Sequence, residues 1–195
     1  MSHLLFKIHK PFGMLSQFSS NDAKESRKKR FLTELCDFPA GLMPIGRLDE
    51  RSEGLLLLTT DGKLSDKINR SGIEKEYYVQ LEGAITEAAI DSLQMGVEIG
   101  VSGKKYFTKP CGARRFIAAP TLPDPDQKLR IAKHRPTSWI TITLKEGKFR
   151  QVRKMTAAVG FPTLRLVPKV SHNPIRHFSF NSILGSINAH FFGKS

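Results

Sequence analysis

Cysteine is scarce in this chain of 195 residues, with only Cys36 and Cys111 present and no C-x-x-C pair. Neither a disulfide framework nor a zinc site is therefore indicated, and a reducing cytoplasm is the expected location. The six histidines show no H-E-x-x-H or comparable spacing, so no metal is expected. No P-loop or G-x-G-x-x-G segment occurs, which argues against a nucleotide cofactor.

Long apolar runs and acidic residues are also in short supply. The leucine run at residues 55–58 is too short to span a membrane, and lysines at 7 and 10 interrupt the N-terminal apolar run, so no signal peptide is expected. Asp and Glu number 18 against 31 Lys and Arg, which gives a formal net charge of +13. Such an excess attracts a phosphate-rich partner. A membrane surface is the competing polyanion, but no basic amphipathic helix or lipidation motif is found, so nucleic acid is the expected partner.

The hydrophobic pattern predicts strands and short helices without a regular strand–helix–strand alternation. Strands are expected at residues 4–9, 55–58, 75–82 and 139–144, with further short strands within 97–118. Helices are expected at residues 31–35, 64–72, 86–96 and 148–159. Residues 118–138 contain four of the eleven prolines and are expected to be irregular. These elements indicate an α+β fold whose sheets are covered on one face.

One acid and one guanidinium stand out in the glycine-bounded segment 44–54, namely Asp49 and Arg47. In a strongly basic chain this pair suggests chemistry on a polyanion, and the alternative is a surface loop with an Asp–Arg ion pair. A basic cluster at residues 24–30 holds five basic residues and one acid. It is either a solvated, mobile loop or a contact for RNA.

Residues 148–159 have the period of an amphipathic helix. The expected apolar stripe consists of Phe149, Val152, Met155, Thr156 and Val159. The basic residues Arg150, Arg153 and Lys154 are expected on the opposite sector, with Arg153 nearest the edge of the stripe. From that boundary a guanidinium can hold a carboxylate in a cleft, whereas the simpler interpretation is a solvated basic face.

Four motifs occur in an order that resembles the ribosomal RNA pseudouridine synthases related to the small-subunit enzyme. They are KPFG at residues 10–13, GRLD at 46–49 with GLLLLTTDG at 54–62, KEY at 75–77, and EGKFRQVRKM at 146–155. The resemblance covers residues 4–166. The segments 49–54, 136–139 and 150–166 are most similar to the branch that acts on the large subunit (23S rRNA), subtype E.

The resemblance implies one catalytic domain over residues 1–195, without the small N-terminal RNA-binding module of most relatives. Two α+β subdomains, at about 1–70 and 71–166, are expected to share a continuous, mostly antiparallel mixed sheet with the active cleft between them. Residues 167–195 are expected to form an atypical tail, because the family's glycine-containing strand and Gly-x-Trp/Tyr-Arg element do not follow. A cytoplasmic monomer is expected.

The resemblance also assigns roles to individual residues. Asp49 corresponds to the catalytic aspartate, Arg153 to the arginine that pairs with it, and Tyr77 to the aromatic that packs against the flipped uracil or acts as a base. Arg47 lies where relatives place a side chain that fills the gap left in the RNA. Further contacts to the RNA are expected from Lys10, Lys148, Arg150, Lys154 and Arg165.

The reaction implied is isomerisation of a uridine in 23S rRNA, in which the N1–C1′ bond breaks and C5 joins C1′. Substrate and product contain the same atoms, so no cofactor is expected. Asp49 could attack C1′, add to C6 or remove the C2′ proton, and the sequence leaves all three open. Two alternative functions are a catalytically idle RNA-binding or ribosome-assembly factor on the same scaffold, and a general basic coat protein for nucleic acid. An acid aimed at phosphates gives a pure binder no advantage.

Overall fold

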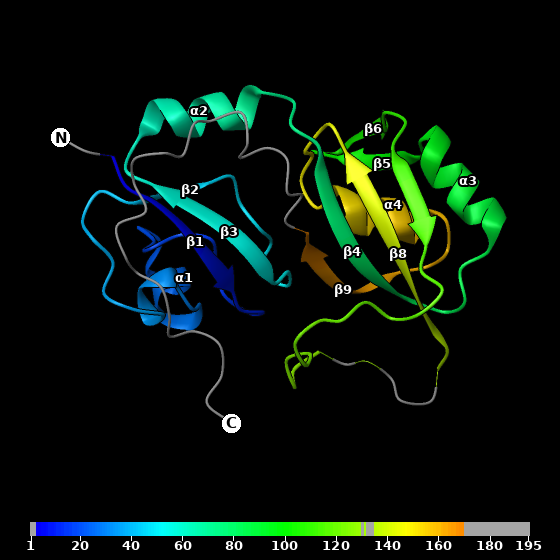
Figure 1. Ribbon diagram of the computed structural model, residues 1–195, viewed down its shortest axis with the longest axis horizontal. Coiled ribbons are helices and arrows are strands. Elements are labelled where there is room, and N and C mark those ends of the chain that lie inside the picture. Colours follow the sequence, from blue (N-terminus) through cyan, green and yellow to red (C-terminus); the bar gives the residue numbers. More distant parts are fainter. Residues whose placement is uncertain (1–2, 130, 132–134, 170–195) are drawn as a thin grey trace.

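Two lobes make up the computed structural model, which describes residues 3–129, 131 and 135–169 (Figure 1). The N-terminal lobe contains β1 (Leu5–Lys10), α1 (Ala23–Lys28), the 3-10 turn η1 (Leu32–Glu34), β2 (Met43–Ile45), β3 (Gly54–Thr59) and α2 (Gly62–Arg70). The C-terminal lobe contains β4 (Lys75–Glu82), α3 (Glu87–Met95), β5 (Glu98–Val101), β6 (Lys104–Phe107), β7 (Gly112–Arg115), β8 (Thr137–Leu144), α4 (Gln151–Ala158) and β9 (Thr163–Pro168). The predicted α+β class is confirmed.

The N-terminal lobe is a three-stranded antiparallel sheet in the order β1-β3-β2. Alternate residues of the central strand, Leu56 and Leu58, are buried with Met14 and Leu32 in a small core. The turn after β3 starts α2, because the Asp61 carboxylate accepts hydrogen bonds from the first backbone N–H groups of the helix. This local sequence logic confirms the predicted leucine strand and the helix that follows it.

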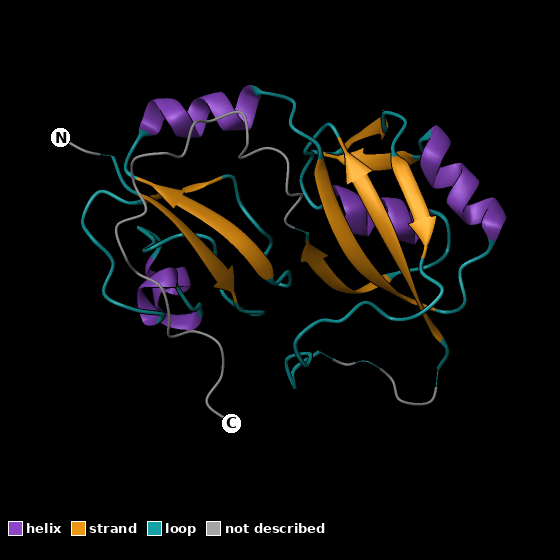
Figure 2. Cartoon of the chain, in the orientation of Figure 1, coloured by secondary structure: helices purple, strands orange, loops and turns teal. Residues whose placement is uncertain are grey.

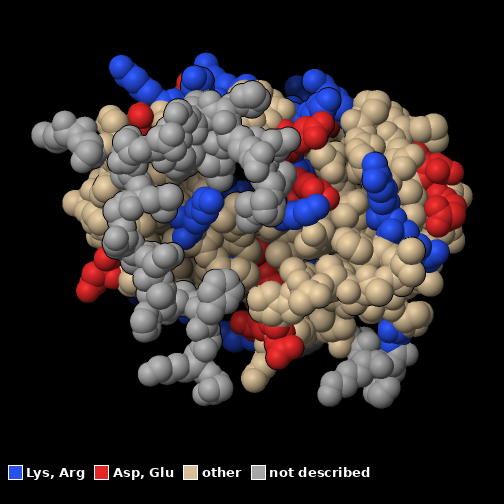
Figure 3. All heavy atoms as spheres, in the orientation of Figure 1, with Lys and Arg blue, Asp and Glu red and all other residues tan. Residues whose placement is uncertain are grey.

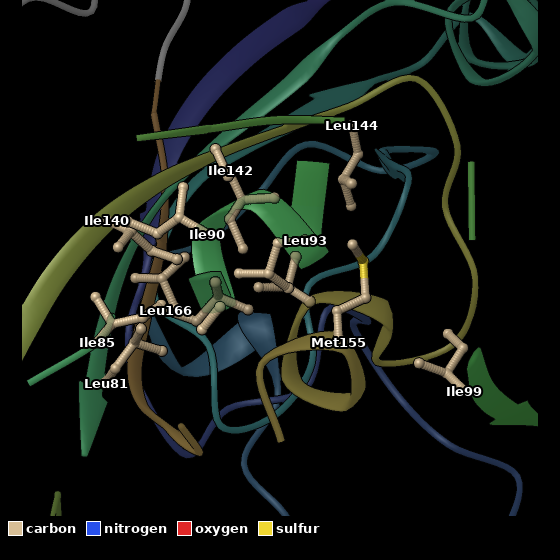
Figure 4. Packing of buried hydrophobic residues seen from close by; sticks show 14 residues of the cluster. Leu81, Ile85, Ile90, Leu93, Ile99, Ile140, Ile142, Leu144, Met155 and Leu166 are labelled. Atoms are coloured by element: carbon tan, nitrogen blue, oxygen red, sulfur yellow. The ribbon is translucent and has the colours of Figure 1, made fainter. Parts of the chain in front are cut away.

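The C-terminal lobe is built on a four-stranded antiparallel sheet in the order β7-β8-β4-β9 (Figure 2). Because side chains alternate along a strand, the buried apolar residues of β4 and β8 point to one face, which α3 and α4 cover. Figure 4 shows side chains from this face, such as Ile140 and Ile142, turned toward Leu93 of α3 and Met155 of α4. The Thr86 hydroxyl caps α3 as predicted, accepting a hydrogen bond from the backbone N–H of Ala89.

The two sheets meet at β3 and β9 but remain separate, and all described strand pairs are antiparallel. The expected continuous mixed sheet is therefore reduced to one backbone hydrogen bond, from Glu53 N–H to Leu166 O at 3.2 Å. Gly54 makes this approach possible, since a Cβ there would lie 3.0 Å from Cδ of Pro168 and 3.1 Å from Cγ1 of Val167. Its φ of +114° also favours glycine.

The structure corrects one of the two interpretations of the basic cluster at residues 24–30. The cluster is not a loop, because most of it forms α1, which the Asp22 carboxylate caps by accepting hydrogen bonds from the N–H groups of Lys24 and Glu25.

The predicted atypical tail lies outside the described residues beyond Lys169, while Pro168 ends β9 at the edge of its sheet. Within the described ranges, no helix has the length and apolar character needed to cross a membrane.

A buried ion pair joins the lobes where β3 meets β9. Glu53 and Arg165 are each 5% exposed, and the Arg165 Nε donates to Glu53 Oε1 at 2.5 Å. The same guanidinium donates to the Pro123 carbonyl at 2.7 Å. The expectation that Arg165 contacts RNA is therefore wrong, because its side chain is buried and bound to protein oxygens.

We expect Arg165→Leu to lower the free energy of unfolding by about 3–5 kcal/mol, because Glu53 would stay buried without a partner charge. The double variant Glu53→Leu/Arg165→Leu should recover most of this loss. Urea denaturation measures both. As a control, Arg70→Leu removes the exposed pair with Asp66 and should cost at most about 1 kcal/mol. A similarly small cost for Arg165→Leu would contradict the structural role given to the buried pair.

Candidate active site

A cleft of about 960 Å³ lies between the lobes and takes residues from both. This volume is in the range of sites that hold small organic ligands, so a nucleoside fits within it. Charged side chains of both signs lie along the boundary of the lobes in Figure 3. The cleft brings together acidic, basic and aromatic side chains from both lobes, namely Arg47, Asp49, Tyr77, Lys148, Phe149 and Arg150.

Asp49 lies on the loop between β2 and β3, and local hydrogen bonds hold that loop in place. The Ser16 hydroxyl donates to the Leu48 carbonyl at 2.9 Å and accepts from the Leu48 N–H at 3.0 Å. The Ser52 N–H donates to the Asp49 carbonyl at 2.9 Å, which closes a turn. The Asp49 side chain is 25% exposed, and its carboxylate accepts no hydrogen bond from the residues that the structure describes. A fixed carboxylate is thus presented to the cleft with its oxygens available.

Arg153 of α4 reaches across the boundary between the lobes. Its Nε lies 3.9 Å from Oδ2 of Asp49. Nη1 donates to the Thr163 carbonyl at 3.1 Å, and Nη2 donates to the Arg51 carbonyl on the Asp49 loop. Burial lowers the pKa of the Arg153 guanidinium, and the Asp49 charge opposes that change. The side chain remains a cation at neutral pH because an arginine pKa starts so high.

Tyr77 of β4 is half-buried beside Asp49 in the same cleft. Burial, and secondarily the charge of Asp49, raises the pKa of the Tyr77 phenol to about 12. The phenol is therefore neutral at physiological pH. It presents an aromatic ring to the cleft, and a pre-formed phenolate base is disfavoured.

The remaining basic residues divide into exposed and committed side chains. Arg47, Lys148 and Arg150 are exposed at the cleft, where a phosphate can reach them. Lys154 is half-buried, and its Nζ donates to the Gly100 carbonyl at 2.6 Å. Among these four, only Lys154 has its Nζ bound to a backbone carbonyl of the described residues.

Lys10 is the second expected RNA contact that the structure overturns. Its residue is 0% exposed, and its Nζ donates to the carbonyls of Pro11 at 2.9 Å and Met14 at 2.8 Å. Burial lowers the pKa of Lys10 to about 8, although the nearby Asp49, Glu50 and Glu53 oppose this change. The side chain organises the turn after β1 from inside.

A hydrogen-bonded network around Glu146 is a feature that the sequence interpretation missed. The carboxylate accepts from the Tyr106 hydroxyl at 2.5 Å, from Gln151 Nε2 at 2.7 Å and from the Lys109 N–H at 3.0 Å. Burial alone would raise the pKa of Glu146, but these hydrogen bonds hold it below its ordinary value. Gln151 in turn accepts from the Lys148 N–H at 2.9 Å, so the network fixes the loop before α4. The E-G-x-x-x-Q spacing in the fourth motif was the available signal.

Phe149 does not belong to the apolar stripe of the helix. It is 71% exposed, because α4 begins only at Gln151 and the preceding Arg150 has a left-handed φ of 53°. The rest of the stripe faces the core: Val152, Met155 and Thr156 are buried, and Val159, just after the helix, is partly buried against the same core. In the described part of the chain, no group of three or more His, Cys, Asp or Glu side chains is placed to share a metal ion.

Comparison with known proteins agrees with this geometry. Residues 5–158 match the family described as RNA pseudouridylate synthase. The chain belongs to this family. It is 42% identical over 166 residues to the ribosomal large subunit pseudouridine synthase E of Xanthomonas campestris pv. campestris, covering 84% of each protein. It is 30% identical over 164 residues to the ribosomal large subunit pseudouridine synthase B of Bacillus subtilis, covering 83% of this chain and 58% of that protein.

A solved structure described as a pseudouridylate synthase has the same fold, with a TM-score of 0.64 at 27% identity. The match covers 86% of this chain and 62% of that one. The family resemblance stated from the four motifs is confirmed, and with it the assignment as an isomerase of the pseudouridine synthase type.

The buried Lys10 predicts a pH-dependent stability. Its pKa is about 8 in the folded protein against an ordinary 10.5, so between these values the unfolded chain holds a proton that the folded chain has lost. The free energy of unfolding should therefore rise with pH in this window, by up to about 3 kcal/mol from this group. Below about pH 8 both states are protonated and the cost of the buried charge is fully present.

Urea denaturation of the parent and Lys10→Met across this pH window measures the effect. The difference between their free energies of unfolding should change with pH, while contributions of other groups cancel. The exposed Lys63→Met is the matched control and should show a constant difference. A constant difference for Lys10→Met as well would show that its amino group is not buried as a cation.

Proposed function

We propose that this protein isomerises a specific uridine in large-subunit ribosomal RNA to pseudouridine, with Asp49 as the catalytic carboxylate. The observation that carries the proposal is the meeting of Asp49 and Tyr77 in the cleft between the lobes, with the Arg153 guanidinium facing the Asp49 carboxylate beside it. The printed names of the relatives support large-subunit ribosomal RNA as the substrate. Such an activity places the protein in the cytoplasm, where ribosomal RNA is modified.

The target uridine must leave its stack to reach a carboxylate inside a cleft. The ring of Tyr77 offers an apolar surface for the extruded uracil, and Arg47 at the mouth can occupy the space that the base leaves. Arg153 faces the carboxylate of Asp49 and holds the loop that carries it. The N1–C1′ bond then breaks, the uracil turns, C5 bonds to C1′, the C5 proton leaves and N1 takes up a proton, so that substrate and product contain the same atoms.

Asp49 has three chemical routes to this result. It can attack C1′, add to C6 of the uracil, or remove the C2′ proton, and each route starts from an ionised carboxylate whose oxygens are available. The oxygens of Asp49 accept no hydrogen bond from the described residues and its residue lines the cleft, which supports this role. The raised pKa of Tyr77 favours its use as a neutral aromatic surface over its use as a base.

Phosphate contacts are assigned to the exposed cations at the cleft. Arg47, Lys148 and Arg150 are exposed there, and Lys154 lies close behind them on α4. These residues hold the RNA backbone without reading its sequence. The excess positive charge of the chain supplies the attraction at longer range.

Pseudouridine mapping of ribosomal RNA tests the proposal directly. Cells with and without the gene should differ at one or a few uridines of the large-subunit RNA. The purified protein should restore the modification on RNA from cells that lack the gene. Identical maps, together with no restored modification, would overturn the proposed substrate.

Asp49→Asn should abolish isomerisation, with a loss of at least about a thousandfold, because an amide cannot act as a nucleophile or a base. RNA affinity should change little. The neighbouring Glu50→Gln is the matched control, since Glu50 lines the same cleft but pairs with Lys29 at 2.7 Å. The measurement is the single-turnover rate on unmodified RNA that contains the uridine identified by the mapping experiment. An Asp49→Asn rate within tenfold of the parent would remove Asp49 from the mechanism.

The two roles considered for Tyr77 are separated by a pair of variants. If Tyr77 mainly provides an aromatic surface, Tyr77→Phe should keep more activity than Tyr77→Leu, which loses the ring but not the apolar volume. Single-turnover rates of both variants on the same RNA give the comparison. Equal losses in the two variants would assign the function to the hydroxyl group instead.

A further inference from the structure

Phe149 stands out because it is a large aromatic side chain left in water at the edge of the cleft. It is 71% exposed and lies among the residues that line the cleft, while Tyr77 on the same cleft is half-buried. Phenylalanine side chains are usually buried in the core of a protein. The exposed ring of Phe149 is therefore available to a ligand in the cleft.

Three basic residues lie next to Phe149 in the sequence or close to its ring in space. Its chain neighbours Lys148 and Arg150 are exposed, and Nζ of Lys154 lies 5.3 Å from the ring centroid. An aromatic surface flanked by positive charges suits a ligand that combines flat bases with phosphates. Single-stranded nucleic acid has this chemistry, whereas an apolar protein surface would not favour three nearby cations.

The segment that carries the ring is held firmly by its neighbours. Glu146 and Gln151 join its two ends through a hydrogen bond of 2.7 Å, and Gln151 also accepts from the Lys148 N–H. Nζ of Lys148 lies 4.8 Å from the centroid of the Tyr106 ring. Arg150 keeps a left-handed backbone that a non-glycine residue rarely adopts. The ring is thus presented from an ordered support at a conformational cost.

We propose that Phe149 stacks on an unpaired base of the RNA next to the target uridine. This inference rests on the proposed function for the identity of the ligand. Phe149 is a positioning residue, because it holds the RNA while Asp49 acts on a different nucleotide. Its loss should therefore raise KM and weaken binding, with little effect on the rate at saturating RNA.

Two short probes separate stacking from charge: an oligoadenylate, and a sugar–phosphate backbone of the same length without bases. Phe149→Ala should weaken binding of the oligoadenylate by about 5- to 140-fold, the range for one lost base–aromatic stack. Binding of the base-free backbone should not change. Phe149→Trp should bind at least as well as the parent. Phe107→Ala removes a ring that is 65% exposed on β6, away from the residues lining the cleft, and is the matched control.

Lys148→Ala provides the opposite pattern. It should weaken both probes and lower the slope of log affinity against log salt by about 0.7, because a phosphate contact is lost. Phe149→Ala should leave that slope unchanged. Thermal denaturation of each variant confirms folding, and Phe149→Leu gives a second non-aromatic variant.

A fluorescence signal reports contact with the ring position itself. In the background Trp139→Phe, which removes the one native tryptophan, Phe149→Trp should be quenched by the oligoadenylate and not by the base-free backbone. The inference is overturned if Phe149→Ala weakens the binding of both probes equally, or of neither. It is also overturned if the parent does not bind the probe with bases more tightly than the base-free backbone. In that case isomerisation by the parent would still support the proposed function. An inactive parent with the expected binding pattern would instead count against the function alone.

Discussion

The guanidinium of Arg153 is the contact on which the site depends, because it ties the Asp49 loop to the C-terminal lobe. It faces the Asp49 carboxylate and also donates to the carbonyls of Arg51 and Thr163. Further along the same lobe, Arg165 forms a second ion pair with Glu53, and this pair is buried. Two arginines from one lobe thus fix both ends of segment 49–53 from the other. The carboxylate keeps its place in the cleft because the lobes cannot shift without breaking these contacts.

This arrangement divides the basic residues by function. The positive charges of Arg165 and Lys10 are used inside the protein, and Arg153 is used at the boundary between the lobes. The exposed cations, Lys148 and Arg150 among them, lie at the cleft, where we propose that they meet the phosphates of the RNA. A high net charge alone therefore says little about which side chain binds RNA. Burial decides it, and burial depends on contacts between distant parts of the chain.

The sequence predicted the features that depend on local pattern. The alternation in 75–82 matches β4, and the spacing of apolar residues after position 151 matches the buried face of α4. Arg165 was misplaced because its partner Glu53 lies 112 residues away. Phe149 was misplaced because helical periodicity cannot reveal the left-handed Arg150, after which α4 begins three residues later than expected. The Asp22 cap was the local signal for α1 that the basic cluster obscured.

The Nε of Arg153 shows how the site is prepared for a substrate. It is buried and has no hydrogen-bond partner in the part of the chain described, while the Asp49 carboxylate lies 3.9 Å away. An unpaired buried donor costs on the order of 1–3 kcal/mol, and a charge-assisted hydrogen bond would be shorter by about 1 Å. The pair therefore keeps the Asp49 carboxylate beside a cation whose Nε donor is unpaired among the described residues. The contact that holds the lobes together thus also leaves the oxygens of the carboxylate open to the cleft.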